Sequence, residues 1–378
     1  MKFNVAVIGG AGHIGLPMSC FIQNKGIPTL IVDKNKDALN QIKESIPPFQ
    51  ENDFEVNLEK AISNGMKVTT DISKISNCNL VIVTLGTSSK AEDKNLFNEV
   101  IKDVFHQIQK NTIVILRSTV EKGLLEEINN QYNTKEVLIA YCPERLAEGF
   151  AFEEIESLPQ IVGTKNEIDF KRVKEFFDLL DINSINVSYS EAEFIKLFIN
   201  SYRYSQFSLI NNFSNIAYKN SIDFKRVLDI SKNNYPRLKG VPDPGFVGGP
   251  CLIKDSKTFI DSFEDEQGII KNLMHANEEF MELIIKKIKN KFTDKKIIQL
   301  GITFKPNSDD LRDSQSLKLN RKLINEGFKV EIVEPNIQGY KNYTDLKDFS
   351  NNILISTFHD EFKDIDFENK KVIIIGNK

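Results

Sequence analysis

A cysteine set among glycines is the first candidate for chemistry in this sequence. The stretch GFVGGPCLIKD, residues 245–255, places Cys251 after Gly248, Gly249 and Pro250 and four positions before Asp255. Glycines supply no side chains to pack against a structural thiol, and they leave room for a bulky group to approach. A thiolate can add to an aldehyde carbonyl, and a hydride can then leave the resulting thiohemiacetal. A single cysteine is more often inert, so the rest of the chain must supply its partners.

A polar stripe precedes this cysteine in the longest helical pattern of the chain. Residues 191–220 contain neither Gly nor Pro, and their apolar positions repeat at helical spacing, which predicts a helix roughly 45 Å long. Lys196, Asn200 and Arg203 fall at i, i+4 and i+7 on one face of it. Such a stripe is either the solvated side of the helix or a Lys–Asn pair that faces a pocket. The sequence leaves both interpretations open.

The N-terminal turn carries the spacing of a dinucleotide site. A predicted strand, the turn GAGHIG and a predicted helix follow one another, and Asp33 closes the next strand. Glycines let a pyrophosphate approach the helix N-terminus, and the acid accepts a hydrogen bond from a ribose hydroxyl. Asp33 favours NAD over NADP, whereas Lys34 beside it argues against that preference. The expected cofactor-binding residues of the turn are Gly10, Gly12, His13, Ile14 and Gly15.

Two further segments end predicted strands with polar residues. Ser118 and Thr119 in RSTVEKG either bind a ligand at the sheet edge or cap the helix expected near Lys122. In YCPERLAEG, Glu144 and Glu148 share a face if the segment is helical, and carboxylates there can act as bases. A solvated acidic loop is the competing interpretation.

Composition excludes several classes of function. The 378 residues carry a formal net charge of −4, which does not indicate broad nucleic-acid or membrane-surface binding. No apolar run approaches the ~18 residues that span a bilayer, and the N-terminus lacks the features of a signal peptide. The four cysteines show no CxxC spacing, so we expect no metal site and no disulfide framework. These features favour the reducing cytoplasm.

The strand and helix patterns predict two α/β halves around a helical middle. IIQLG, a helix and NEGFKVEIVEPN near the C-terminus repeat the order of VAVIG, a helix and NKGIPTLIVDKN near the N-terminus. The second copy lacks GxGxxG, so it should bind something other than a dinucleotide. We predict two Rossmann-like, doubly wound domains joined by a helical domain. The expected boundaries are 1–188, 189–290 and 291–378.

Six segments in order resemble the nucleotide-sugar 6-dehydrogenases, the UDP-glucose and UDP-N-acetylhexosamine dehydrogenases. These segments are GAGHIG, STVEKG, CPER, EAEFIKLFINSYR, GFVGGPCLIKD and GITFKPNSDDLRDS, and they span nearly the whole chain. The resemblance implies oxidation of a sugar C6 alcohol to a carboxylate with two NAD. It also implies that the C-terminal domain holds the UDP-sugar and that the long helix forms a homodimer.

The resemblance assigns roles to individual residues. Cys251 would be the nucleophile, Lys196 with Asn200 would stabilise the oxyanion, and the glycines would admit the hexose. Glu144 would be the base, with Thr119 assisting the water and proton steps. Asp255 would position water or the lysine. Arg312 would lie toward the cofactor. The implied substrate-binding residues are Glu144, Arg145, Lys196, Asn200, Arg237, Phe246, Gly248 and Lys305.

The motif CPER and the segment NYPR resemble the N-acetylhexosamine branch, with Arg145 as the main reason. UDP-N-acetylmannosamine or UDP-N-acetylglucosamine is then the expected substrate, for surface polysaccharide synthesis. UDP-glucose 6-dehydrogenase is the close alternative, and it shares every catalytic residue. A single-step β-hydroxyacid dehydrogenase has no use for Cys251 or a second nucleotide domain. A non-catalytic NAD or nucleotide-sugar binding protein is the alternative from a different class.

Overall fold

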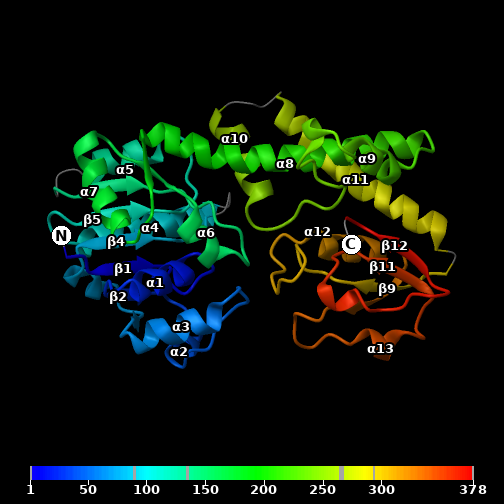
Figure 1. The fold of residues 1–378 in the computed structure, drawn as a ribbon, viewed down its shortest axis with the longest axis horizontal. Coiled ribbons are helices and arrows are strands. Elements are labelled where there is room, and N and C mark those ends of the chain that lie inside the picture. The colour runs from blue at the N-terminus through cyan, green and yellow to red at the C-terminus, as the bar shows by residue number, and fades with distance from the viewer. Residues whose placement is uncertain (1, 88–90, 133–135, 264–267, 293, 377–378) are drawn as a thin grey trace. The chain divides into compact units, whose positions relative to one another are not determined.

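The structure is a computed structural model that describes residues 2–87, 91–132, 136–263, 268–292 and 294–376. The chain divides into two compact units, Met1–Phe198 and Ile199–Lys378. The boundary falls inside the long helix α8 (Tyr189–Lys219). Each unit contains its own sheet (Figure 1).

The first unit is built on an eight-stranded sheet in the order β3-β2-β1-β4-β5-β6-β7-β8. Neighbouring strands are parallel except for the antiparallel pair β6 and β7. The strand bounds are β1 (Val5–Ile8), β2 (Thr29–Val32), β3 (Lys67–Thr69), β4 (Leu80–Val83), β5 (Ile113–Leu116), β6 (Leu138–Tyr141), β7 (Gln160–Gly163) and β8 (Ser184–Val187). The first six strands follow the order of a dinucleotide-binding fold.

Helices cover both faces of this sheet, so its central strands are apolar throughout. In β1, Val5 and Val7 join one hydrophobic core, while Ala6 and Ile8 join the core on the opposite face. Helices α1 and α7 pack on the first face, and α4 and α5 pack on the second (Figure 1). The helix bounds are α1 (Gly15–Asn24), α2 (Lys36–Lys43), α3 (Phe54–Ser63), α4 (Ala91–Gln107), α5 (Leu124–Tyr132), α6 (Ala151–Ser157) and α7 (Glu167–Asp178), with a 3₁₀ turn at Ile72–Asn77.

The second unit combines helices with a four-stranded parallel sheet in the order β10-β9-β11-β12. Helices α11 and α12 pack on one face of the sheet, and α13 packs on the other (Figure 1). The strands are β9 (Lys296–Leu300), β10 (Lys329–Val333), β11 (Asn352–Ile355) and β12 (Lys371–Ile374). The helices are α9 (Phe224–Lys232), α10 (Leu252–Phe263), α11 (Ile269–Lys291), α12 (Gln315–Asn325) and α13 (Tyr343–Leu346), with 3₁₀ turns at Pro236–Leu238 and Asp360–Phe362.

The expected fold class is confirmed: two parallel sheets of the Rossmann type and a helical region with one long helix are present. The expected three-domain boundaries stay a prediction. No helix in the described part of the chain is long and apolar enough to cross a membrane. The same residues contain no group of three or more His, Cys, Asp or Glu side chains that could hold a metal ion.

Candidate active site

The glycine turn after β1 has the shape of a cradle for a dinucleotide. A Cβ on Gly10 would lie 2.8 Å from a backbone oxygen of β1, and one on Gly15 would lie 2.5 Å from the Gly9 carbonyl oxygen. Neither position can accept a side chain without movement of the backbone. A Cβ on Gly12 would meet only the Gly9 oxygen, at 3.4 Å, so this side of the turn is open. The open side suits close approach of a pyrophosphate to the N-terminus of α1.

Asp33 and His13 complete the surroundings of this turn. The Asp33 carboxylate follows β2 and accepts the Ala11 N–H at 3.1 Å and the Asn35 N–H at 2.9 Å. It therefore holds the turn against the next strand, at the position where a ribose hydroxyl is expected. The His13 ring packs on the Phe49 ring with a centroid separation of 4.0 Å. The two rings are inclined by 30°, so His13 packs against Phe49 beside the turn.

Ser118 and Thr119 do not cap the next helix, contrary to one of the two interpretations. Helix α5 begins five residues after Thr119, too far along the chain for its hydroxyl to reach the first turn. Glu193 of α8 supplies the acceptors instead: its carboxylate accepts the Gly123 N–H at 2.8 Å and the Leu125 N–H at 3.1 Å. The pKa of Glu193 is raised, because burial outweighs these two backbone bonds. Ser118 and Thr119 therefore remain candidates for ligand contacts at the sheet edge.

Glu144 is held in a buried ion pair. Its Oε2 accepts Nη2 of Arg117 at 2.6 Å and Nε at 3.0 Å, and the two side chains are 9% and 3% exposed. Its Oε1 accepts the backbone N–H groups of Arg145 at 2.7 Å and Leu146 at 2.9 Å. Arg117 also donates to Gln160 Oε1 at 2.8 Å. Both carboxylate oxygens are thus occupied by donors.

This pairing determines the ionisation of Glu144. Burial opposes the charged form, but the charge and hydrogen bonds of Arg117, the Leu146 N–H and the charge of Lys196 together lower the Glu144 pKa. The ammonium of Lys196 donates to the Glu144 backbone carbonyl at 2.6 Å. The Glu144 side chain therefore favours its ionised form, its backbone carbonyl is the group that contacts Lys196, and a lowered pKa weakens the carboxylate as a base.

The segment around Glu144 is a loop rather than a helix. Strand β6 ends at Tyr141 and α6 begins at Ala151, so Glu144 and Glu148 do not share a helical face as one interpretation had it. Glu51 clamps the far end of this loop, because its carboxylate accepts the Gly149 N–H at 2.9 Å and the Ala151 N–H at 3.1 Å. Because these two N–H groups donate to a side chain, they are not available for helical hydrogen bonds, and the segment before α6 stays a loop.

The polar stripe of α8 separates into a buried and an exposed part. Lys196 and Asn200 are each 7% exposed, whereas Arg203 is exposed to solvent. The first two residues therefore match the interpretation of a Lys–Asn pair that faces the protein, and Arg203 belongs to the solvated side.

Cys251 stands at the N-terminal end of α10, next to a buried carboxylate. It is the exposed member of the four cysteines, and Cys20, Cys78 and Cys142 are buried. One turn further on, Asp255 is fully buried and donates its N–H to the Cys251 carbonyl at 2.8 Å.

The Asp255 carboxylate is held from two sides. It accepts Nδ2 of Asn200 at 2.5 Å and pairs with Nζ of Lys254 at 2.8 Å. Cys251 itself lies just before the N-terminal end of α10. Asn200 is thus linked to the backbone of Cys251 through the buried Asp255.

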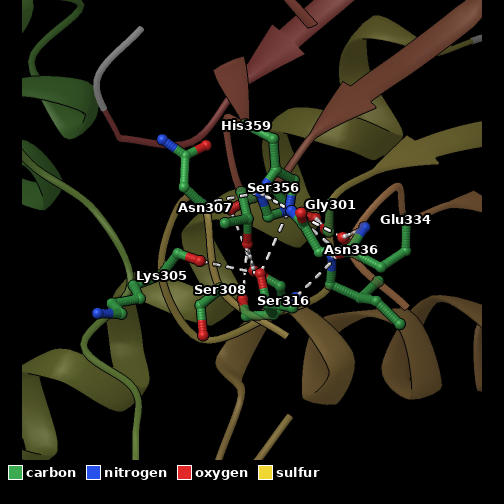
Figure 2. Close-up of polar contacts among 12 residues, drawn as sticks. Gly301, Lys305, Asn307, Ser308, Ser316, Glu334, Asn336, Ser356 and His359 are labelled. Carbon is green, nitrogen blue, oxygen red and sulfur yellow. Dashed lines mark hydrogen bonds and ion pairs between the residues drawn. The ribbon is translucent and has the colours of Figure 1, made fainter. Parts of the chain in front are cut away.

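The expected substrate and cofactor contacts of the C-terminal region have definite structural partners. Nε of Arg312 donates to both oxygens of Asp310, at 3.0 and 2.8 Å, and Nη2 donates to one of them at 2.6 Å. The Arg312 side chain is nevertheless 52% exposed, so it can still meet a ligand. Lys305 lies with its ammonium 5.8 Å from the Phe304 ring centroid, and Figure 2 shows it extending away from the labelled polar cluster.

Three other expected substrate residues have structural contacts of their own. Arg145 donates a short hydrogen bond to the Pro159 carbonyl. The Arg237 guanidinium lies 5.6 Å from the Tyr235 ring centroid. Phe246 packs against the core of the second unit, which gives this residue a structural role whether or not it contacts substrate.

The acid that ends β10 does not repeat the role of Asp33. The Glu334 carboxylate accepts the Ile302 N–H at 2.7 Å, as Asp33 accepts the Ala11 N–H, but its side chain is completely buried and faces His359. Figure 2 shows this cluster at the loop after β9. A ribose cannot reach a carboxylate that is already surrounded, which agrees with the expectation that the second sheet binds something other than a dinucleotide.

The structure brings several predicted residues together and adds others that the sequence analysis missed. In the first unit Glu144 meets Lys196, and in the second unit Asn200 meets Asp255 beside Cys251. Arg117 was missed, although a charged residue directly after a buried strand must be paired and so signalled its importance. The other residues missed are Gln160, Glu193, Phe304 and His359.

The fold and the glycine turn define an NAD-binding oxidoreductase with a second, nucleotide-binding domain. The family profiles agree along the chain, matching the NAD binding domain at 3–181, the central domain at 190–280 and the UDP binding domain at 298–377. The protein belongs to the UDP-glucose/GDP-mannose dehydrogenase family, whose members are NAD-dependent dehydrogenases.

Known relatives extend over nearly the full length. A UDP-N-acetyl-D-mannosamine dehydrogenase of Methanocaldococcus jannaschii is 27% identical, over 96% of this chain and 88% of its own length. The solved UDP-D-ManNAc dehydrogenase of Pyrococcus horikoshii has a TM-score of 0.90 at 23% identity, covering 99% of this chain and 95% of the other. A UDP-glucose dehydrogenase of Pyrobaculum islandicum has a TM-score of 0.87 at 20% identity, covering 100% and 95%. The two structures establish the fold.

Proposed function

We propose that this protein oxidises the C6 alcohol of a UDP-N-acetylhexosamine to a carboxylate in two steps, through a covalent intermediate on Cys251. The observation that carries the proposal is the placement of the exposed Cys251 at the start of α10, one turn before the buried Asp255. Single-step alcohol oxidation has no use for such a thiol. The turn after β1 would hold NAD, and the bound cofactor would supply the hydride acceptor for each of the two oxidations.

The first oxidation removes a hydride from C6 and a proton from its hydroxyl, which gives the aldehyde. The Cys251 thiolate then forms a bond to C6, and the thiohemiacetal loses a second hydride to become a thioester. Water breaks the sulfur–carbon bond, which releases the carboxylate and regenerates the thiol.

Residues of the chain divide the supporting roles. Lys196, oriented by the Glu144 carbonyl, is the cation for the developing oxyanion, and Asn200 orients Asp255. The occupied oxygens and the lowered pKa of Glu144 favour a positioning role for it over the expected role as base. Thr119 keeps its expected part in the water and proton steps, and the fully buried Asp255 keeps its expected part in positioning water or the lysine.

The substrate class rests on the relatives and on Arg145. Several relatives near 25% identity are named UDP-N-acetyl-D-mannosamine dehydrogenases, which supports an N-acetylated sugar. UDP-glucose is the second candidate, supported by the solved UDP-glucose dehydrogenase that shares the fold. Lys305, Gly248 and Arg237 remain the proposed contacts to the UDP-sugar.

The test is the number of NADH molecules formed for each limiting UDP-sugar, measured with UDP-N-acetylmannosamine, UDP-N-acetylglucosamine and UDP-glucose. We expect two NADH per acetylated sugar and no carboxylate product from Cys251→Ala, while Cys78→Ala, which changes a buried thiol, keeps the stoichiometry. Turnover of UDP-glucose alone would overturn the substrate assignment but not the chemistry. One NADH per sugar that survives Cys251→Ala would overturn the thiol mechanism.

We also propose a homodimer formed through α8. Along this helix Tyr202, Leu209, Phe213 and Ile216 expose between 44% and 56% of their surface at helical spacing. An apolar stripe of this length on a long helix is typical of an interface. No disulfide joins the four cysteines, all of which are among the described residues, and this supports the reducing cytoplasm as the compartment. A uronate product suits the expected role in surface polysaccharide synthesis.

A further inference from the structure

The glycines before Cys251 make room for a residue of the same unit. Gly249 has a φ of +89°, and a Cβ placed on it would lie 2.7 and 2.8 Å from two carbon atoms of the Phe304 ring. A Cβ on Gly248 would lie 3.4 Å from the Phe304 Cβ and 3.2 Å from the Asp313 carbonyl oxygen. The Gly249 distances are shorter than a van der Waals contact between carbon atoms, so the backbone of the cysteine loop packs directly against the Phe304 ring. The expectation that the glycines admit the hexose stays a prediction, and Phe304 occupies one side of them.

Phe304 belongs to a loop that is fixed from beneath by buried groups. The loop follows β9, and Glu334 accepts the Ile302 N–H at 2.7 Å. The Thr303 hydroxyl donates to the Lys305 carbonyl at 2.9 Å. The Phe304 N–H donates to the Asp310 carbonyl at 3.1 Å, which joins the two sides of the loop.

His359 anchors the far end of the loop and is itself fixed by Glu334 (Figure 2). Its Nδ1 accepts the Asn307 N–H at 2.9 Å, so the ring proton resides on Nε2, which faces Glu334 Oε1 at 3.1 Å. Both side chains are fully buried. The Asn336 amide lies 3.0 Å from Nδ1 on the same side. A buried pair with this geometry cannot reorient without losing several hydrogen bonds at once.

We propose that Phe304 is a positioning residue for Cys251, and that the buried Glu334–His359 pair is what holds Phe304 in place. The ring fills the space beside Gly249 and so limits how closely the cysteine loop can approach the loop after β9. The role in turnover rests on the proposed function; the contact itself does not. The anchoring role of the Glu334–His359 pair also explains why Glu334, which resembles Asp33 in its position in the sequence, is buried.

Phe304→Leu tests the proposal, with Phe328→Leu as the matched control because Phe328 is buried in the core of the same unit. A displacement of about 1 Å can cost on the order of a hundredfold in rate, so we expect kcat to fall at least about tenfold in Phe304→Leu while KM for the UDP-sugar changes little. Phe328→Leu should lose stability and keep kcat. An unchanged kcat in Phe304→Leu, or an equal fall in Phe328→Leu, would overturn the proposal.

The supporting pair is tested by His359→Asn and His359→Leu. Asparagine places an acceptor near the position of Nδ1 and can still receive the Asn307 N–H, whereas leucine cannot. We expect His359→Asn to retain most of the native kcat and His359→Leu to lose most of it. Equal activity of the two variants would contradict the anchoring role.

A double-mutant cycle separates this proposal from the proposed function. Gly249→Ala is measured alone and in the Phe304→Ala background, with the rate of Cys251 alkylation by iodoacetamide and the urea midpoint as readouts, in the absence of sugar and NAD. Removal of the ring removes the clash, so the effect of Gly249→Ala should shrink in the Phe304→Ala background. Additive effects would overturn the contact even if the enzyme oxidises UDP-sugars. A non-additive cycle in a protein inactive on all three sugars would support the contact and overturn the function.

Discussion

The Arg117–Glu144 pair gives the sharpest test of how this site is held together. Arg117→Met keeps an apolar chain of similar length but removes the guanidinium that makes two hydrogen bonds to Glu144 and one to Gln160. Glu144 is then left as a buried carboxylate supported by the Arg145 and Leu146 N–H groups. Removing one partner of a buried pair costs about 3–5 kcal/mol, and we expect a loss of that size in the free energy of unfolding at pH 7.

The pH dependence of this loss has a definite sign. In the native protein the Glu144 pKa is lowered, so its ionised form stabilises the fold above the unfolded pKa near ~4.3, and that stability is lost as pH falls through the folded pKa. In Arg117→Met burial remains without the neutralising cation, so the Glu144 pKa rises. The carboxylate then takes up a proton as pH falls, and the penalty is relieved. The difference between native protein and variant should therefore be largest near pH 7 and shrink toward pH 4.

Urea unfolding followed by far-ultraviolet circular dichroism measures this difference, because the chain contains no tryptophan for fluorescence. Lys25→Met is the control: Lys25 pairs with Asp181 at 3.1 Å on the surface, with side chains 30% and 81% exposed, and its loss should cost at most about 1 kcal/mol. Adding Glu144→Gln to Arg117→Met should recover part of the stability. A loss below about 1 kcal/mol, or one that is constant with pH, would refute the reasoning.

Three further predictions follow from thiol burial, cofactor recognition and the exposed helix face. One thiol, Cys251, should react with Ellman's reagent in the native protein, whereas burial raises the pKa of both Cys20 and Cys142 to about 12, so these should react only after unfolding. Asp33→Asn should weaken NAD binding about tenfold and narrow the preference over NADP, as measured by isothermal titration, whereas unchanged affinity would contradict the ribose contact. Phe213→Asp should convert a dimer to a monomer in sedimentation velocity, and an unchanged sedimentation coefficient would place the interface elsewhere.

Much of the fold could be predicted because its signals are local. Strand β1 has the sequence VAVI because a parallel strand covered on both faces is apolar throughout. The turn that follows it requires glycine at Gly10 and Gly15, where a Cβ would collide with backbone atoms. Helix α8 runs for 31 residues through a segment that contains neither Gly nor Pro. Periodicity and turn chemistry depend on neighbouring residues, so they are visible without the fold.

The contacts of the candidate site depend instead on strand order and loop path. Arg117 and Glu144 are 27 positions apart and meet because β5 and β6 are neighbours in the sheet. The same separation along a different strand order would leave both charges without partners. Neither this pairing nor the contact between the Glu144 backbone carbonyl and Lys196 could be read from the motif CPER.

The sequence by itself determined the class of chemistry: a dinucleotide turn, a cysteine freed from side-chain packing and the helix that carries Lys196 and Asn200. Tertiary structure alone decided what each of these groups touches. The sequence shows the glycines at 248 and 249. Only the path of the loop after β9 places Phe304 in the space beside them. Local patterns encode backbone conformation, whereas contacts between distant side chains exist only once the chain has brought its strands and loops together.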